Sequence, residues 1–359
     1  MHTRVKKFDG DTVFKIALVA AVVFGVAFGV ISTQISLAQE GGGGQTFLVQ
    51  AGAGIAPNNS EALIFAPANL RVHRGDTVNW AVNGFHNIRF TEEGNIPFGL
   101  IPGMDDVEVP QINPAVAFPT IESGATYSGG PANSGLPLDG PPGFSLVIDL
   151  EPGTYSYVCD VHPGMNGVIE VVDDATEIPS PIEAAMQGAA EIGALVGPVF
   201  GIHEELEAGG RIATPDENGV AHIQADASGA GRVSIQQFFP FTAVIEVGQS
   251  VEFSVPQDAA DPHTVTWPPL RGQDVAPIPQ DAGPPILGFG RGFTPFVVDS
   301  DGNAVEDNAI DLSSEYNSAL LFPGSSFTLT YTEPGAYPFV CNIHPAMQGT
   351  VVVLPAGEA

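Results

Sequence analysis

The sequence predicts an all-β protein built from two tandem β-sandwiches, with a short helical linker between them and an apolar segment at the N-terminus. The 359 residues include 43 glycines and 32 prolines, an abundance typical of short strands joined by many turns. Hydrophobic residues make up 44% of the chain, which is enough for two cores of ordinary size. Two long segments also repeat each other in order and pattern, which indicates a duplicated unit.

Each repeat begins with two strands about a glycine turn, followed by a histidine. The first pair covers residues 70–80 and precedes His86, and the second covers residues 244–253 and precedes His263. Apolar and polar residues alternate in both, the pattern of a half-buried hairpin. We therefore expect a hairpin at the start of each sandwich.

Each repeat ends with a strand, a short loop and a second strand. Residues 151–159 read EPGTYSYVC, and residues 333–341 read EPGAYPFVC. Both continue with a loop that contains histidine, proline, a small residue and methionine, and then with a β-branched run at 168–172 or 350–353. Because the order is the same in both halves, the sequence predicts the same sandwich twice.

A long insertion rich in glycine and proline separates the histidine from the cysteine in each repeat. The insertions cover about residues 91–143 and 268–323. Such loops lie on the surface, where they either shape a face for a partner or only decorate the fold.

The segment between the repeats is predicted to contain one amphipathic helix packed on a domain. Ser180 and Glu183 form a capping box with Pro181 at the first helical position. The pair Gly197–Pro198 is expected to end the helix. Met186 is interpreted as core filler and not as a metal ligand. The apolar residues at helical spacing are Ile182, Ala185, Met186, Ala189, Ile192 and Val196.

The predicted division of the chain has four parts. They are a signal peptide or membrane anchor at 1–38, a first domain at 45–174, a linker at 175–228 and a second domain at 229–356.

The N-terminus has the pattern of an export signal. Four basic residues precede the uncharged apolar run 16–31, and Ser36–Ala38 gives a small-x-small cleavage pattern. There is no twin arginine, which favours the Sec route. The alternative is an uncleaved membrane tether through residues 16–37, a stretch long enough to cross a bilayer. Either alternative places the rest of the chain outside the cytoplasm: periplasmic, on the cell surface or secreted.

The formal net charge of −30 limits the partners of this protein. Such an acidic surface argues against nucleic acid and against anionic lipid, and it would suit a basic protein partner. Solubility in a salty or acidic medium is the other explanation.

Each repeat supplies two histidines, one cysteine and one methionine, with three of them in the pattern C-x-x-H-x-x-M. Type 1 copper is bound by two imidazoles and one thiolate, with a weak axial thioether. A single thiolate per site disfavours structural zinc, which usually takes more cysteine. The sequence therefore predicts two type 1 copper ions per chain. The predicted ligands are His86, Cys159, His162 and Met165 in the first repeat, and His263, Cys341, His344 and Met347 in the second.

Two alternatives concern these residues. A disulfide between Cys159 and Cys341 would have to bring two loop tips from different domains within about 6 Å, and it would leave the repeated histidines and methionines unexplained. In the other alternative, Met165 and Met347 only pack in the core.

Both repeats resemble cupredoxins, the family of plastocyanin and amicyanin, over about residues 45–173 and 233–355. The short C-x-x-H-x-x-M loop is more similar to that of amicyanin. The resemblance implies Greek-key sandwiches with copper near one end of each. It also implies that His162 and His344 present a ring edge to solvent, through which electrons pass.

The resemblance further implies that the residue after the first histidine braces the cysteine sulfur. Asn87 matches that position, whereas Thr264 departs from it. Because hydrogen bonds near the sulfur tune the metal, we expect the two sites to differ.

The expected function is that of an extracytoplasmic electron carrier, not an enzyme, with redox proteins as partners, such as a basic cytochrome or a copper enzyme. Multicopper oxidases need His-x-His pairs, and none occurs here. Copper nitrite reductases have a histidine directly before the type 1 cysteine, where this chain has Val158 and Val340. One alternative is a copper-dependent oxidoreductase with an additional copper site that uses His203 or His222, although both are expected to be surface polar residues. The other is an envelope protein that binds or delivers copper.

Overall fold

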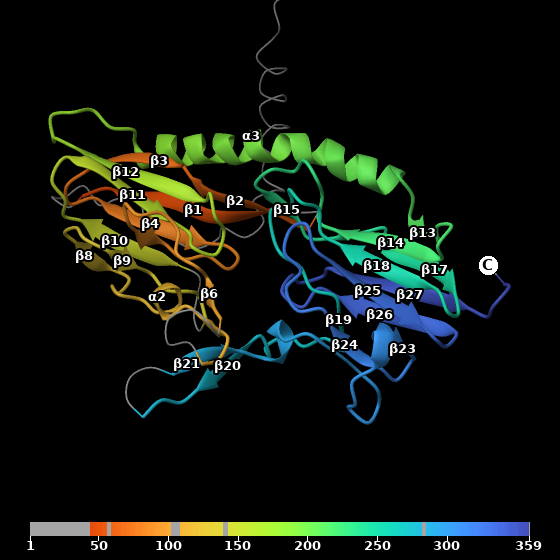
Figure 1. The fold of residues 1–359 in the computed structure, drawn as a ribbon. Helices are drawn as coiled ribbons and strands as arrows, with labels where there is room; N and C mark the ends of the chain where they lie inside the picture. The colour runs from red at the N-terminus through yellow and green to blue at the C-terminus, as the bar shows by residue number, and fades with distance from the viewer. Residues whose placement is uncertain (1–43, 56–58, 102–107, 139–142, 282–284, 359) are drawn as a thin grey trace, which may run out of the picture.

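The computed structural model describes residues 44–55, 59–101, 108–138, 143–281 and 285–358, so the predicted signal or anchor lies outside the described residues. Two β-sandwiches lie side by side, and one long helix runs across the top of both (Figure 1). The predicted fold class of tandem β-sandwiches is confirmed.

The first sandwich packs a six-stranded sheet against a five-stranded sheet. Its strands are β1 (Thr46–Ile55), β2 (Ser60–Ala66), β3 (Asn69–His73), β4 (Thr77–Val82), β5 (Arg89–Phe90), β8 (Ala125–Tyr127), β9 (Ala132–Asn133), β10 (Phe144–Ile148), β11 (Gly153–Val158), β12 (Asn166–Val172) and β15 (Val233–Ile235). The strand orders are β15-β2-β1-β4-β10-β8 and β3-β12-β11-β5-β9. Between the sheets, Trp80 stacks edge-on against Phe90 and Tyr157 in a fully buried core.

The second sandwich packs a seven-stranded sheet against a five-stranded sheet. Its elements are β13 (Ile212–Ala213), β14 (Val220–Ala225), β16 (Phe238–Phe239), β17 (Thr242–Glu246), β18 (Ser250–Ser254), β19 (Thr266–Trp267), η1 (Arg291–Phe293), β22 (Phe296–Val298), η2 (Glu306–Asn308), β23 (Ala309–Ile310), β24 (Glu315–Asn317), β25 (Ser326–Tyr331), β26 (Gly335–Val340) and β27 (Gln348–Leu354). The strand orders are β13-β17-β27-β26-β19-β24-β22 and β16-β14-β18-β25-β23. Phe339 packs edge-on against Phe238 and Phe253 in its core.

The predicted hairpins are wrong in one respect, although their strands and turns are present. β3 and β4 flank the turn at Gly75, but they belong to opposite sheets of the first sandwich. β17 and β18 are related in the same way about Gly248. Alternation showed that each strand has one buried face, but two strands that face one core from opposite sheets show the same alternation as a hairpin.

The segment predicted as a linker also contains strands of the second sandwich. β13 pairs with β17, and β14 pairs with β18. The chain then returns to the first sandwich, where β15 pairs with β2, before β16 pairs with β14. The connection therefore joins the two halves by strand pairing.

The two long insertions pair with each other. From the first come β6 (Gly99–Leu100), β7 (Gln111–Ile112) and the short helix α2 (Pro114–Ala117), and from the second come β20 (Val275–Ile278) and β21 (Ile286–Phe289). They form a sheet of order β20-β21-β7-β6 below the sandwiches (Figure 1). A small core that includes Ile112, Val116 and Leu287 stabilises it. These segments of the insertions hold the two halves together.

The helix α3 (Pro181–Ala208) begins as predicted but continues past its predicted end. Ser180 Oγ accepts a hydrogen bond from the Glu183 N–H, and the Glu183 carboxylate accepts one from the Ser180 N–H. The helix passes through Pro198 and ends at Ala208. Val196 and Val199 are buried on either side of the proline, so packing offsets the hydrogen bond that proline cannot donate.

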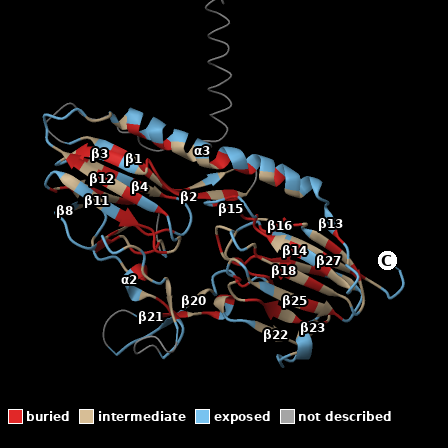
Figure 2. Cartoon of the chain, turned by 45° about the horizontal axis from the view of Figure 1, so that its top comes forward, coloured by how far each residue is buried: buried red, intermediate tan, exposed pale blue. Residues whose placement is uncertain are grey.

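The buried face of α3 differs from the predicted stripe. Ala184, Gly188, Val196, Val199 and His203 are buried, and Figure 2 shows the outer face of the helix exposed. Met186 is 67% exposed, so its interpretation as core filler is wrong, and Ile182 is also exposed. By length and composition alone α3 could span a membrane, but here it packs on β1, β2 and β15.

Candidate metal centres

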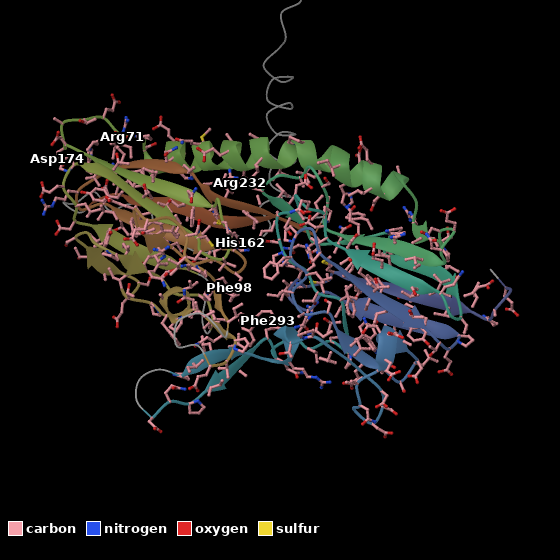
Figure 3. All side chains as sticks on the ribbon, viewed as in Figure 1. Arg71, Phe98, His162, Asp174, Arg232 and Phe293 are labelled. Atoms are coloured by element: carbon pink, nitrogen blue, oxygen red, sulfur yellow. The ribbon has the colours of Figure 1, made fainter. Side chains whose placement is uncertain are left out.

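The first centre lies at the end of the first sandwich that faces the second (Figure 3). His86 precedes β5, and the loop between β11 and β12 provides Cys159 and His162. Cys159 Sγ lies 3.6 Å from His86 Nδ1 and 3.6 Å from His162 Nδ1, and the two Nδ1 atoms are 2.9 Å apart. His86 and Cys159 are buried, and His162 is 12% exposed.

The second centre repeats this geometry. Cys341 Sγ lies 3.9 Å from His263 Nδ1 and 3.5 Å from His344 Nδ1, and the two Nδ1 atoms are 3.0 Å apart. His263 and Cys341 are fully buried. Within the described part of the chain, these two groups are the clusters of such residues close enough to hold a metal ion.

The donor atoms fit a metal ion. Ligands about 2.0–2.3 Å from one ion at wide angles are themselves about 3–4 Å apart, as the nitrogen and sulfur atoms are here. Two imidazoles and one thiolate form the donor set of type 1 copper. Both cysteines are free thiols among the described residues, which argues against the disulfide alternative.

The loop that provides three predicted ligands is closed by its own backbone. The Cys159 N–H donates to the Met165 carbonyl, and the Met165 N–H donates to the His162 carbonyl; Cys341, His344 and Met347 repeat both bonds. Met165 packs in the same buried cluster as Cys159, and Met347 packs with Cys341. An axial role for either methionine remains a proposal.

The electrostatics of the first centre favour a thiolate beside a charged imidazole. Burial lowers the pKa of His86, but hydrogen bonds to Cys159 and Glu61 outweigh this effect and raise the pKa to about 9. Burial raises the pKa of Cys159, but His162 and His86 outweigh this effect and lower it to about 6. The proton that a metal would displace is therefore held by an imidazole and not by the sulfur.

The second centre has the same balance. Burial lowers the pKa of His263, but Asp226 and Cys341 outweigh this effect and raise it to about 10. The pKa of the Cys341 thiol is lowered against the effect of burial by His344 and His263.

A carboxylate lies behind the first histidine of each centre. His86 Nε2 is 2.8 Å from Glu61 Oε1, and His263 Nε2 is 3.3 Å from Asp226 Oδ2. Such carboxylates fix the orientation and tautomer of a ligating histidine, so that Nδ1 is free to bind a metal.

A third carboxylate lies between the two centres. Asp261 is 2% exposed, with Oδ1 3.3 Å from His162 Nε2 and Oδ2 3.8 Å from His344 Nε2. The expectation that both rings present an edge to solvent is therefore wrong, because the second sandwich covers the first at this point and each Nε2 faces Asp261. Burial raises the pKa of Asp261, but the imidazoles of His162, His344 and His263 outweigh this effect and lower it.

Asn87 and Thr264 have the same structural role despite their different side chains. Asn87 Oδ1 accepts a hydrogen bond from the Asp160 N–H, and Thr264 Oγ1 accepts one from the Asn342 N–H. Each therefore ties the histidine segment to the residue after the cysteine. In the second centre the Thr264 N–H also points at Cys341 Sγ, 3.4 Å away.

The residue after the cysteine distinguishes the two centres. Asp160 is buried and forms a two-pronged ion pair with Arg89, with both N–O distances at 2.7 Å. Asn342 takes this position in the second centre and bonds to Asp274. Because nearby charge tunes a metal site, the two environments are not equivalent.

The carboxylates Glu61, Asp226 and Asp261 were missed from the sequence. Only Asp261 gives a local signal, since it lies two residues before His263.

Among the described residues, His203 and His222 belong to no group of His, Cys, Asp and Glu side chains that could hold a metal ion. His203 is buried in α3, with its Nε2 3.1 Å from Gln237 Oε1, so the expected surface position is wrong for this residue. His222 is exposed and lies beside Asp216 and Glu252.

The match to a known protein family agrees with the donor set of these centres. The family of copper binding proteins described as plastocyanin/azurin matches residues 54–172 and 231–354, which is more than half of the chain. This chain therefore belongs to the plastocyanin/azurin family of copper-binding proteins, the cupredoxins, and contains two such domains.

Solved structures similar to this chain include single cupredoxins and a larger enzyme. A purple cupredoxin from Nitrosopumilus maritimus is 19% identical, with 37% of this chain and 98% of that chain covered and a TM-score of 0.21. Amicyanin from Paracoccus versutus is 13% identical over 40% of this chain and 79% of that chain, with a TM-score of 0.19. A copper-containing nitrite reductase from Thermus scotoductus SA-01 is 13% identical over 87% of this chain and 68% of that chain, with a TM-score of 0.22.

Proposed function

We propose that this protein is an electron carrier with two type 1 copper sites, one in each domain. The observation that carries the proposal is the convergence of two imidazole Nδ1 atoms and one cysteine Sγ in each half of the chain. The proposed ligands are His86, Cys159, His162 and Met165 in the first site, and His263, Cys341, His344 and Met347 in the second.

Copper in such a site supplies one-electron chemistry by alternating between Cu(II) and Cu(I). The protein supplies rigidity. Glu61 and Asp226 orient the buried histidines, the backbone closes the ligand loop, and the buried surroundings exclude water. A site that changes little between two oxidation states exchanges electrons without rearranging its ligands.

The experiment is copper analysis of the purified protein with two matched variants, Cys159→Ser and Cys341→Ser. We expect two copper ions per wild-type chain and an intense blue thiolate-to-copper absorption band. Each variant should keep the other site, so about half of the colour should remain.

Three results would contradict this proposal. They are a single variant that loses all colour, a disulfide in the intact protein, or catalytic consumption of oxygen or nitrite with a simple electron donor. The last result, together with a third copper ion, would support the oxidoreductase alternative.

The location and the partners belong to the same proposal. The export pattern at the N-terminus supports a protein outside the cytoplasm, either cleaved after Ala38 or tethered through residues 16–37. The net charge of −30 supports a basic redox protein as the partner.

A further inference from the structure

We propose that Asp261 joins the two metal centres into one redox unit, in which an electron passes within the chain through His162, Asp261 and His344. This inference rests on the proposed function and adds to it an internal route and the residue that holds it in place. Asp261 acts through the two histidines, so it is a positioning residue.

The first step of the argument is the burial of Asp261. Its side chain is 2% exposed, and its Oδ1 has no hydrogen-bond partner among the described residues. An ionised carboxylate is costly to bury without donors. The two imidazole Nε2 atoms lie near its two oxygens, one on each side.

The second step is the chemistry of the imidazoles. A histidine that binds a metal through Nδ1 carries its remaining proton on Nε2. His162 and His344 would then both be N–H donors, and Asp261 has one oxygen for each. Loading of the two centres therefore gives each oxygen of the buried carboxylate an imidazole donor, in addition to the Ser234 hydroxyl that lies near Asp261.

The third step is the fixed relation between the two halves. Asn59 of the first half donates to the Pro345 carbonyl in the second ligand loop, at 3.1 Å. Arg232, just before β15 on the segment that connects β14 and β16 of the second sandwich, donates to the Gly164 carbonyl in the first ligand loop, at 3.3 Å. Two further features hold the two halves in this arrangement. They are the sheet β20-β21-β7-β6 and the pairing of β15 with β2.

The redox step moves one electron and no atoms. The centre with the lower potential is oxidised, the other is reduced, and both Nε2 protons stay on their rings. An external one-electron donor, such as a reduced redox protein, supplies the electron, and an external acceptor removes it.

The test compares Asp261→Asn with Asp258→Asn in the full copper-loaded protein. Asparagine at position 261 has nearly the same shape, but it offers one acceptor oxygen and so can serve only one imidazole. Asp258 lies on the same loop and bonds to Ser228 and Gly229 instead. The control therefore removes the same charge from the same segment without touching either histidine.

The first readout is nuclear magnetic resonance of the copper(I) protein, which reports each imidazole N–H separately. In wild type we expect two slowly exchanging Nε2 protons, from His162 and His344. Asp261→Asn should lose at least one of them, and Asp258→Asn should keep both. Two rapidly exchanging protons in wild type would overturn the proposal without any variant, so it remains testable even if Asp261→Asn does not fold.

The second readout is the rate of internal electron transfer after a radical pulse reduces one centre. We expect this rate to fall roughly tenfold or more in Asp261→Asn, because small displacements of reacting groups change rates steeply. The rate in Asp258→Asn should equal that of wild type. An unchanged rate in Asp261→Asn, with two blue coppers still bound, would overturn this inference and leave the carrier function intact. A wild-type protein that binds no blue copper would instead overturn the proposed function and this inference with it.

Discussion

At the scale of single residues, the two methionines are the predicted ligands with the least geometric support for a ligand role. Met165 is fully buried beside Cys159, which suits either a long axial bond or simple packing. The axial ligand helps to set the potential of a type 1 site. We therefore expect Met165→Gln to lower the potential of the first site and to leave the second unchanged, as measured by a redox titration.

The matched variant Met347→Gln should act on the second site alone. A titration curve that does not change in either variant would mean that the methionines only fill the core. A loss of stability without a change in potential would lead to the same conclusion.

The sequence predicted the residues at the centres better than the residues around them. His86, Cys159 and His162 could be found because each has a counterpart at the same place in the second repeat. Glu61 and Asp226 could not be found, because they come from different strands that only the fold brings behind the histidines. Asp261 lies beside a histidine of each domain and has no counterpart in the other repeat. Comparison of the two repeats could therefore not indicate it.

At the scale of elements, α3 shows how closely a helix can pack on a sheet. A Cβ atom at Gly188 would lie 2.8 Å from backbone atoms of Ala66 and Pro67, whereas one at Gly193 would meet nothing within 4 Å. We expect Gly188→Ala to destabilise the protein by about 1–3 kcal/mol through overpacking. Gly193→Ala should stabilise it by up to about 1 kcal/mol, because alanine is the better helix former.

Denaturant unfolding of the two variants measures this difference, and each serves as the control for the other. Equal effects of both alanines would show that α3 does not rest on β2 through Gly188. The comparison is clean because the substitution is identical and both sites are helical.

The helix α3 also shows which of its features a sequence pattern can predict and which it cannot. The capping box at Ser180 and Glu183 was confirmed because it depends on neighbours in sequence. The buried face and the end were predicted wrongly, because they depend on where the sheet lies. The helix rests on Gly188 and Val196 and continues past Pro198, where local rules favour a stop.

At the scale of the whole molecule, the two sandwiches place their metal centres toward each other and leave little of either exposed. The side chains of His162 and His344 are 12% and 13% exposed. The sequence predicted two sandwiches and two centres, but it did not predict the relation between them, which depends on strand pairing between the two insertions. For the proposed electron carrier, we therefore expect an external partner to dock near the boundary between the two sandwiches, beside His162 and His344.

The charge of the molecule gives this docking a testable kinetic signature. With a net charge of −30, the protein should attract a basic partner and speed its approach. Salt screens such attraction, with a Debye length of about 10 Å at 0.1 M. We expect the rate of electron exchange with a cationic cytochrome, followed by stopped-flow mixing, to fall steadily as salt is raised. An uncharged small reductant is the control and should react at a rate that salt hardly changes. If the cytochrome rate is also indifferent to salt, the acidic surface serves solubility, and docking at the boundary between the two sandwiches is apolar.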